Sequence, residues 1–340
     1  MIIHGRLPWP LVFQVLGVIA AVWLVVLTRQ IWLLVFTALI IAAAILPAAR
    51  LGERYRVPRG VTVLVVYAVV AGLMTLMGRL LWPALSEQWQ QFITQLPRLI
   101  ENVKGWVGDI QYFILRWGGS LPTPKTDSLD AVAGALLANT FRFTAGTLGV
   151  VFEMLAVVVL AAYLVIDAPH VGRTLLALLP ADARPTATRL TPSVLDRIGG
   201  YVRGQLVSSL FVGALIAIAL TLLGVRYSLL IGAIAAVFNI VPFVGATLAA
   251  VLAVLAALNE SVTLAALTLA AMVGAQTVEG KLLAPHFVGR ATGLHALAVL
   301  LALLAGAHLA GLIGALVAVP LLAGLWEIVR ELWVEPRRDD

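Results

Sequence analysis

Long apolar segments separated by short polar stretches dominate the chain. The longest of them, residues 291–326, contains no Lys, Arg, Asp or Glu. As one helix it would extend about 54 Å at ~1.5 Å per residue, whereas the hydrocarbon core of a bilayer is about 30 Å thick. We therefore predict a helical hairpin within lipid that turns near residues 306–311.

The other apolar segments predict further membrane helices, which cover residues 9–27, 31–49, 60–81, 143–166, 204–225 and 261–278. Residues 228–258 are too long for one simple span and are interrupted between Asn239 and Gly245. Because Pro242 removes a backbone donor and Gly245 frees the backbone, we predict two shorter helices around a break, as a hairpin or a re-entrant pair. In total we expect about eight or nine spanning or re-entrant helices.

Residues 82–140 differ from these segments because they carry charge, Pro and Gly. Apolar residues recur every three or four positions from Trp82 to Phe113, which is typical of an amphipathic helix. Pro97 should kink or split this helix. The apolar stripe either contacts lipid or neighbouring subunits, or covers the insert's own core; the insert's small size favours the first interpretation. We thus divide the chain into three spans (1–81), an extracytoplasmic insert (82–140) and a transport core with a charged tail from residue 327 (141–340).

The composition supports a membrane location: 61% of residues are hydrophobic and 12% are charged, and the mean hydropathy is +1.02. A soluble domain carries about 25% charged residues. The apolar runs are continuous rather than alternating, which indicates helices and not the strands of a barrel. The sequence therefore predicts an all-α, polytopic membrane protein.

The net charge of +6 is best explained by membrane topology rather than by a nucleic-acid partner. If the amino terminus is cytoplasmic and both long segments are hairpins, fifteen Lys and Arg residues lie on the cytoplasmic side and eight on the other. This bias predicts that both termini are cytoplasmic.

Signatures of enzymes and pumps do not occur in the sequence. The chain has no cysteine, which excludes disulfides and thiolate metal sites. Residues 274–281 superficially resemble a phosphate-binding loop, but the spacing is one residue too long and Leu282 replaces the hydroxyl that would bind magnesium. We therefore expect no enzyme activity, no cofactor, no bound metal and no ATP-driven pump within the chain.

Polar residues inside predicted spans are the better guide to function, because hydrocarbon makes them costly. Glu153 lies near the middle of the span at residues 143–166. An ionised carboxylate there needs a partner, a water-filled cavity or a raised pKa. It is a candidate for proton or cation coupling; the alternatives are a structural hydrogen bond or a span shifted along the sequence.

The interruption formed by Asn239, Pro242 and Gly245 is a second candidate site. Backbone groups freed inside a membrane are tolerated only where they are buried or line water, and broken helices at mid-membrane form many transporter sites. A plain turn at the membrane surface is the alternative. Pro320, with Gly324, could form a paired break in the last segment.

The end of the span at residues 261–278 carries a third cluster. Gln276, Glu279 and Lys281 lie within reach of one another on a helix, and Pro285 should stop that helix. They could line a gate, or form a salt bridge at the membrane edge. His295 could titrate near neutrality, although a hydrogen-bonded packing role is the alternative.

Several short motifs occur in a fixed order over residues 161–322. They are Tyr163–Asp167, Tyr201–Gln205, Val241-Pro242-Phe243-Val244-Gly245, the set Glu279, Pro285, Gly289 and Gly293–His295, and Gly311–Pro320. In order and spacing they resemble the autoinducer-2 exporter family of bacterial permeases. This chain has Asn239 where that family often has an acidic residue before the break, which leaves ion coupling through this position open.

The resemblance implies a multi-pass transporter of the bacterial inner membrane, with export of the quorum-sensing signal autoinducer-2 in some members and sodium–proton antiport in others. It also implies homo-oligomers, of which a pentamer is one form. We therefore expect a secondary transporter or exporter-like permease for a small solute or ion, coupled to protons or sodium. A passive oligomeric channel and a non-transporting scaffold that works through the insert remain alternatives. The expected partners are the solute, membrane lipid and further copies of the chain, but no nucleic acid.

Overall fold

The structure is a computed structural model that describes residues 16–17, 20, 23–24, 26–117, 147–242, 244–283 and 294–334. Every regular element in these ranges is a helix, which confirms the all-α fold. The predicted first span lies largely outside the described residues. The helices are α2 (Arg29–Arg54), α3 (Arg59–Arg116), α5 (Thr147–Ile166), α6 (Ala168–Ala177), α7 (Arg184–Leu222), α8 (Ser228–Phe238), α9 (Val244–Leu258), α10 (Val262–Val278) and α12 (Ala296–Val329).

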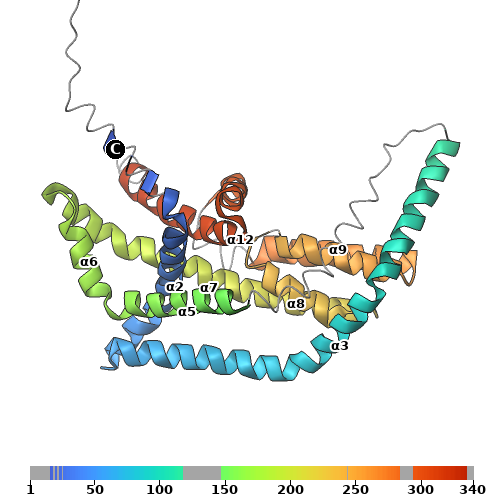
Figure 1. Cartoon of the computed structure of the whole chain (residues 1–340), viewed down its shortest axis with the longest axis horizontal. Helices are drawn as coiled ribbons and strands as arrows, with labels where there is room; N and C mark the ends of the chain where they lie inside the picture. Colours follow the sequence, from blue (N-terminus) through green and yellow to red (C-terminus); the bar gives the residue numbers. More distant parts are fainter. Residues whose placement is uncertain are drawn as a thin grey trace, which may run out of the picture.

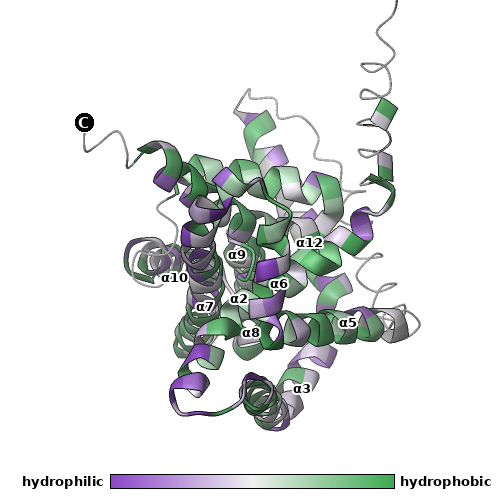
Figure 2. Cartoon of the chain, turned by 90° about the vertical axis from the view of Figure 1, so that its left-hand side faces the viewer, coloured by the Kyte–Doolittle hydropathy of each residue, from purple (hydrophilic) through white to green (hydrophobic). Residues whose placement is uncertain are grey.

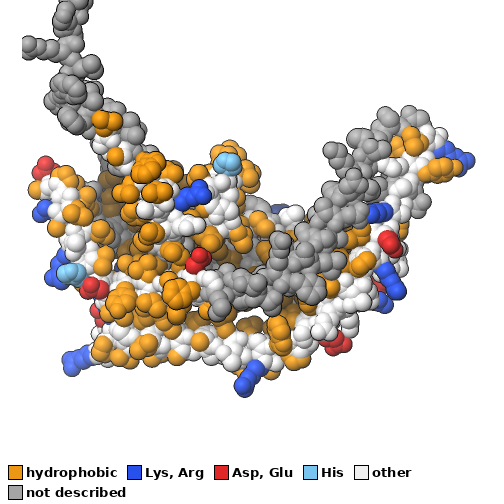
Figure 3. Space-filling view, viewed as in Figure 1, with side chains coloured by type: hydrophobic (Ala, Val, Ile, Leu, Met, Phe, Trp, Pro, Cys, Tyr) orange, Lys and Arg blue, Asp and Glu red, His pale blue; other side chains and the backbone are white. Residues whose placement is uncertain are grey.

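Five of the described helices are long and apolar enough to cross a membrane, namely α2, α3, α7, α10 and α12 with the short turns that extend them. Helices α5 and α6 form a further pair bent by 79°. Figure 2 shows hydrophobic residues along most of the ribbon, and Figure 3 shows apolar side chains across much of the face that it draws. Large apolar side chains are exposed on α2, α3, α5, α7 and α12. Such an outer surface requires lipid, so the chain is a multi-pass membrane protein.

Helix α7 occupies the centre of the fold, where it packs against α2, α8, α10 and α12 (Figure 1). Its contact with α8 depends on two glycines. A methyl group added at Gly213 would lie 2.7 Å from the Gly232 carbonyl oxygen, and one added at Gly232 would lie 2.7 Å from that of Gly213. Small residues therefore let the two backbones touch, as is common between membrane helices.

Helix α3 is one continuous helix of 58 residues that contains both Pro83 and Pro97. The prediction that Pro97 could split the helix is wrong: a proline costs one backbone hydrogen bond and bends a helix, but the flanking turns continue it. Figure 1 shows α3 running along one side of the molecule and then turning away from it. The predicted boundary between residues 81 and 82 thus falls inside one helix.

The middle of the amphipathic stripe on α3 packs against the core of the same chain. Phe92, Leu96 and Leu99 are buried in a cluster with residues of α7, α8, α9 and α10. The ring of Phe92 meets that of Tyr227 edge to face, with centroids 5.6 Å apart. Farther along, Phe113 and Trp117 are exposed. The middle of the stripe therefore covers the helix core formed by other segments of the chain and not a core of the insert itself, while contact of its exposed end with lipid or other subunits stays a prediction.

The predicted final hairpin is present within α12. Ala310 and Gly311 have non-helical backbone angles, and Gly311 has a φ of 61°, which glycine adopts without strain. The backbones of the two arms touch beside this turn. A methyl group added at Gly306 would clash with the Gly314 backbone, and one added at Gly314 would clash with the Gly306 backbone. The first arm, residues 296–309, is about 21 Å long. It is shorter than the ~30 Å hydrocarbon core.

Candidate functional site

The predicted break between residues 239 and 245 separates α8 from α9. The Asn239 N–H still donates to the Ala235 carbonyl at 2.8 Å, and the Val241 N–H donates to that of Phe238 at 3.1 Å. The chain then turns at Pro242. Gly245 packs directly on the Asn239 backbone, where an added methyl group would lie 2.6 Å from the Asn239 Cα. The two short apolar helices are therefore closed tightly against each other, and only glycine fits at residue 245.

Asn239 is fully buried and joins three elements. Its Nδ2 donates to Glu279 Oε1 at 2.7 Å, and its backbone carbonyl accepts from Gln205 Nε2 of α7 at 2.6 Å. Its Oδ1 has no hydrogen-bond partner among the described residues. The tertiary structure thus brings two predicted residues, Asn239 and Glu279, into one polar group in the helix core.

Two buried hydroxyls of the helix core also lack partners within the described part of the chain. They are Ser209 Oγ on α7 and Thr268 Oγ1 on α10. A buried polar group without a partner costs free energy, and it commonly marks an unseen water, ion or ligand. Sequence reasoning missed these residues and Gln205, since a small polar side chain in an apolar helix does not reveal which neighbour it faces.

The other residues predicted for the third cluster do not join this polar group. Gln276 is exposed on α10, while Glu279 is half-buried. Pro285 lies outside the described residues. The α12 hairpin does flank the break: Val319 shares a buried cluster with Val241 and Tyr201. Pro320, next to Val319, is itself fully buried in the second arm.

Glu153 and His295 lie elsewhere. Glu153 is exposed on α5, a helix that packs mainly on α2, α3 and α6. No described residue forms an ion pair or hydrogen bond with it. His295 caps α12, since its Nδ1 accepts from the Leu297 N–H at 3.3 Å. The structure therefore gives His295 a helix-capping contact and leaves the coupling role of Glu153 a prediction.

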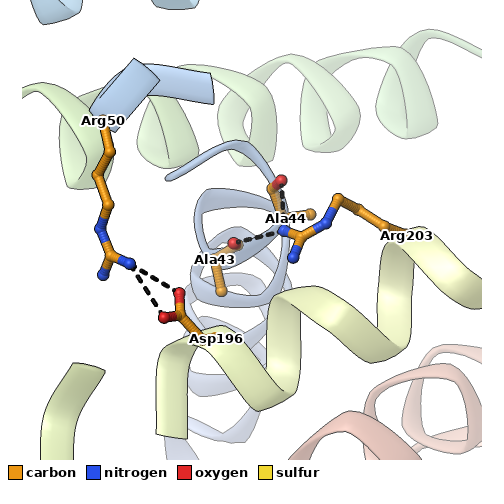
Figure 4. A network of polar contacts seen from close by, with 5 residues as sticks. All are labelled: Ala43, Ala44, Arg50, Asp196 and Arg203. Carbon is orange, nitrogen blue, oxygen red and sulfur yellow. Dashed lines mark hydrogen bonds and ion pairs between the residues drawn. The ribbon is translucent and has the colours of Figure 1, made fainter. Parts of the chain in front are cut away.

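A second polar network ties α7 to its neighbours. Figure 4 shows Arg50 of α2 facing Asp196 of α7, with nitrogen–oxygen distances of 2.9 and 3.0 Å, and Arg203 donating to the Ala44 carbonyl at 3.0 Å. These contacts lie on the α2 side of α7.

On the α12 side of α7, the carboxylate of Glu327 is only 4% exposed. It accepts from Arg197 Nε at 2.8 Å and from Arg330 at 2.7 Å. The sequence-based assignment of Glu327 to a charged tail is wrong, because helix α12 continues past it and buries it. The burial is tolerated because two guanidinium groups compensate the charge.

Within the described ranges, no three His, Asp or Glu side chains gather as metal ligands would. The described core contains the Asn239–Glu279 pair beside the break between α8 and α9, within a bundle of long apolar helices. Interrupted helices that enclose polar groups within a membrane bundle are typical of membrane transport proteins.

Comparison with known proteins assigns the chain more closely. Residues 11–333 match the family described as "AI-2E family transporter", and the chain belongs to this family. The sequence resemblance is thereby confirmed, and the chain is a membrane transport protein.

Named relatives cover most of the chain. It is 29% identical to "Putative transport protein YrrI" of Bacillus subtilis, over 89% of this chain and 86% of that protein. It is 26% identical to "Putative transport protein YueF" of the same organism, over 82% and 77%. It is also 26% identical to "AI-2 transport protein TqsA" of Escherichia coli, over 84% and 81%. The name of the last protein attributes AI-2 transport to that protein.

Proposed function

We propose that this protein is a secondary transporter whose solute or coupling ion passes the break between α8 and α9. The observation that carries the proposal is the pair of Asn239, which is fully buried, and Glu279, which is half-buried, joined by a 2.7 Å hydrogen bond. A carboxylate and an unpaired amide oxygen are costly among apolar helices. Their presence is explained if a proton, a cation or a polar solute completes the site during transport.

The geometry suits coupling to a proton or a monovalent cation. The Asn239 Oδ1 atom and the Glu279 carboxylate offer oxygen ligands, which hard cations prefer. The site also lies at the carboxyl end of α8, where the helix dipole is negative. Binding a positive charge at Glu279 would weaken its attraction for the Asn239 amide. Because Asn239 also holds α7 through Gln205, the break could then change shape with the state of Glu279.

A small solute moved across the bacterial inner membrane is the cargo that fits best. The name of the relative TqsA makes autoinducer-2 the first solute to test, and a cation such as sodium the second. The distribution of Lys and Arg supports cytoplasmic termini. The exposed apolar residues at the end of α3, which include Tyr112, Phe113 and Leu115 and lie beyond the predicted span, support an assembly of several identical subunits.

Flux through liposomes that contain the full-length protein tests the proposal. Autoinducer-2 and sodium uptake would be measured under an imposed proton gradient. We expect Glu279→Gln to lower gradient-driven flux by at least about tenfold, since this substitution keeps the hydrogen-bonding shape but removes the charge and its titration. Glu101→Gln, which changes an exposed carboxylate on α3, is the matched control and should retain flux.

Three outcomes separate the alternatives. Unchanged pH dependence in Glu279→Gln contradicts the proposed site. Loss of coupling in Glu153→Gln alone would transfer the coupling role to α5. If wild-type protein still equilibrates the solute after the gradient is collapsed, but never accumulates it, the protein is a passive channel.

A further inference from the structure

A large apolar cavity lies between α2 and both arms of the α12 hairpin, away from the break between α8 and α9. Its volume is about 550 Å³, within the usual range for small-molecule sites. Trp32 and Phe36 of α2, Ala305 and Leu309 of the first arm, and Ala318 and Leu322 of the second arm are among the residues that line it. An apolar chain would fit this lining, whereas a polar solute would find almost no hydrogen-bond partners.

Among the described residues that line the cavity, Arg29 is the one that carries a charge. It is also the only Lys, Arg, Asp or Glu between Arg6 and Arg50. Its side chain is exposed, and no described residue pairs with it. The nearby indole of Trp32 already donates to Thr28 Oγ1 at 3.0 Å. In the part of the chain that the structure describes, the cavity therefore presents one cation beside a long apolar surface.

The ligand chemistry follows from this combination. Arg29 lies between two predicted spans, at the level where lipid headgroups begin. A guanidinium there attracts an anion, and its planar fork matches a phosphate group. The remainder of the ligand must be apolar, because the other lining residues that the structure describes are Val, Trp, Leu, Phe, Ala and Gly. A phospholipid with a net negative headgroup has both parts and surrounds the protein in its membrane.

We propose that this cavity binds an anionic phospholipid, with one acyl chain between α2 and the α12 hairpin and the phosphate on Arg29. The lipid would contact both arms where Gly306 and Gly314 lie back to back. It would thus hold α2 against the hairpin that flanks the break. This site is separate from the proposed transport route and does not depend on it.

Native mass spectrometry of the full-length protein, titrated with phosphatidylglycerol, tests the headgroup contact. We expect Arg29→Gln to weaken phosphatidylglycerol binding about tenfold, as the loss of a charge-assisted contact does. The control Arg79→Gln removes an equally exposed arginine from α3 and should bind like wild type. Equal losses in both variants, or none in Arg29→Gln, would overturn the site.

The acyl-chain contact is tested separately by filling the cavity. Ala305→Phe places a ring where the chain would lie, and should reduce occupancy several-fold. Ala307→Phe, on the same arm but outside the cavity, should not. Inorganic phosphate should fail to displace the lipid, since it lacks the apolar part. Wild-type occupancy in Ala305→Phe, or displacement by phosphate, would contradict the proposal.

Discussion

At the scale of single residues, two glutamates of the described helices have polar partners, although Glu327 is buried and Glu279 is half-buried. Glu327 is held by Arg197 and Arg330, and Glu279 by the Asn239 amide. The two differ in what they leave open. Glu327 is enclosed between two cations, whereas the Asn239–Glu279 pair retains an unpaired oxygen and no neighbouring cation forms a bond with it among the described residues. The first arrangement suits a fixed structural contact and the second a site that exchanges a ligand.

The two ion pairs of Glu327 predict that its removal lowers the stability of the protein. Glu327→Ala should destabilise the protein by about 3–5 kcal/mol, because it leaves Arg197 uncompensated in a buried position. Thermal unfolding of the purified protein measures this. The control Glu331→Ala removes a nearby carboxylate that is not part of the network and should shift unfolding little. A similar shift in both variants would show that Glu327 contributes no specific ion pair.

At the scale of helices, membrane thickness and chain length decide where the chain must turn. Two apolar segments exceed one crossing, and the structure interrupts both, between Phe238 and Val244 and at Ala310 and Gly311. The positions of the turns follow the glycines. Gly245 is required by its close packing on Asn239. At Gly311 an added methyl group would meet nothing within 4 Å, so packing does not require glycine there, and its positive φ does.

Gly311→Ala should therefore act through the backbone alone. With a φ of 61° and a ψ of −144°, a region that essentially only glycine populates, alanine would cost on the order of 1–3 kcal/mol, and the unfolding temperature should fall. Gly274→Ala is the control, because it also meets nothing within 4 Å but lies in the regular helix α10, where alanine should be neutral or stabilising. If Gly311→Ala unfolds at the wild-type temperature, the turn does not depend on this residue.

At the scale of the whole molecule, α3 links the insert to the transport core. Gln88 and Gln95 on α3 hold the start of α8, through the Leu230 N–H at 2.9 Å and the Tyr227 hydroxyl at 2.8 Å. Asn102 bonds to Asn259 just after α9. The start of α8 and the end of α9 are thus both anchored to α3. The described part of the insert, residues 82–117, therefore packs on the other helices of the chain in its first half.

Phe92→Ala should consequently destabilise the whole protein by about 3 kcal/mol, because it removes a buried ring and its contact with Tyr227. Phe113→Ala, which truncates an exposed ring on the same helix, should change stability by less than about 0.5 kcal/mol. Cooperative unfolding of detergent-purified protein measures both. Equal, small effects would mean that the insert and the core unfold independently.

By itself, the sequence determined the helical class, most of the helix positions and both interruptions, because these depend on local properties: the length of apolar runs against bilayer thickness, and the backbone chemistry of Pro and Gly. It also pointed to Asn239 and Glu279 separately. Only the tertiary structure decided that these two meet across 40 residues, that Glu327 meets Arg197 across 130, and that Arg29 borders a cavity. Those outcomes depend on how each helix is rotated and packed against its neighbours, and a uniformly apolar helix carries no polar face from which that rotation could be predicted.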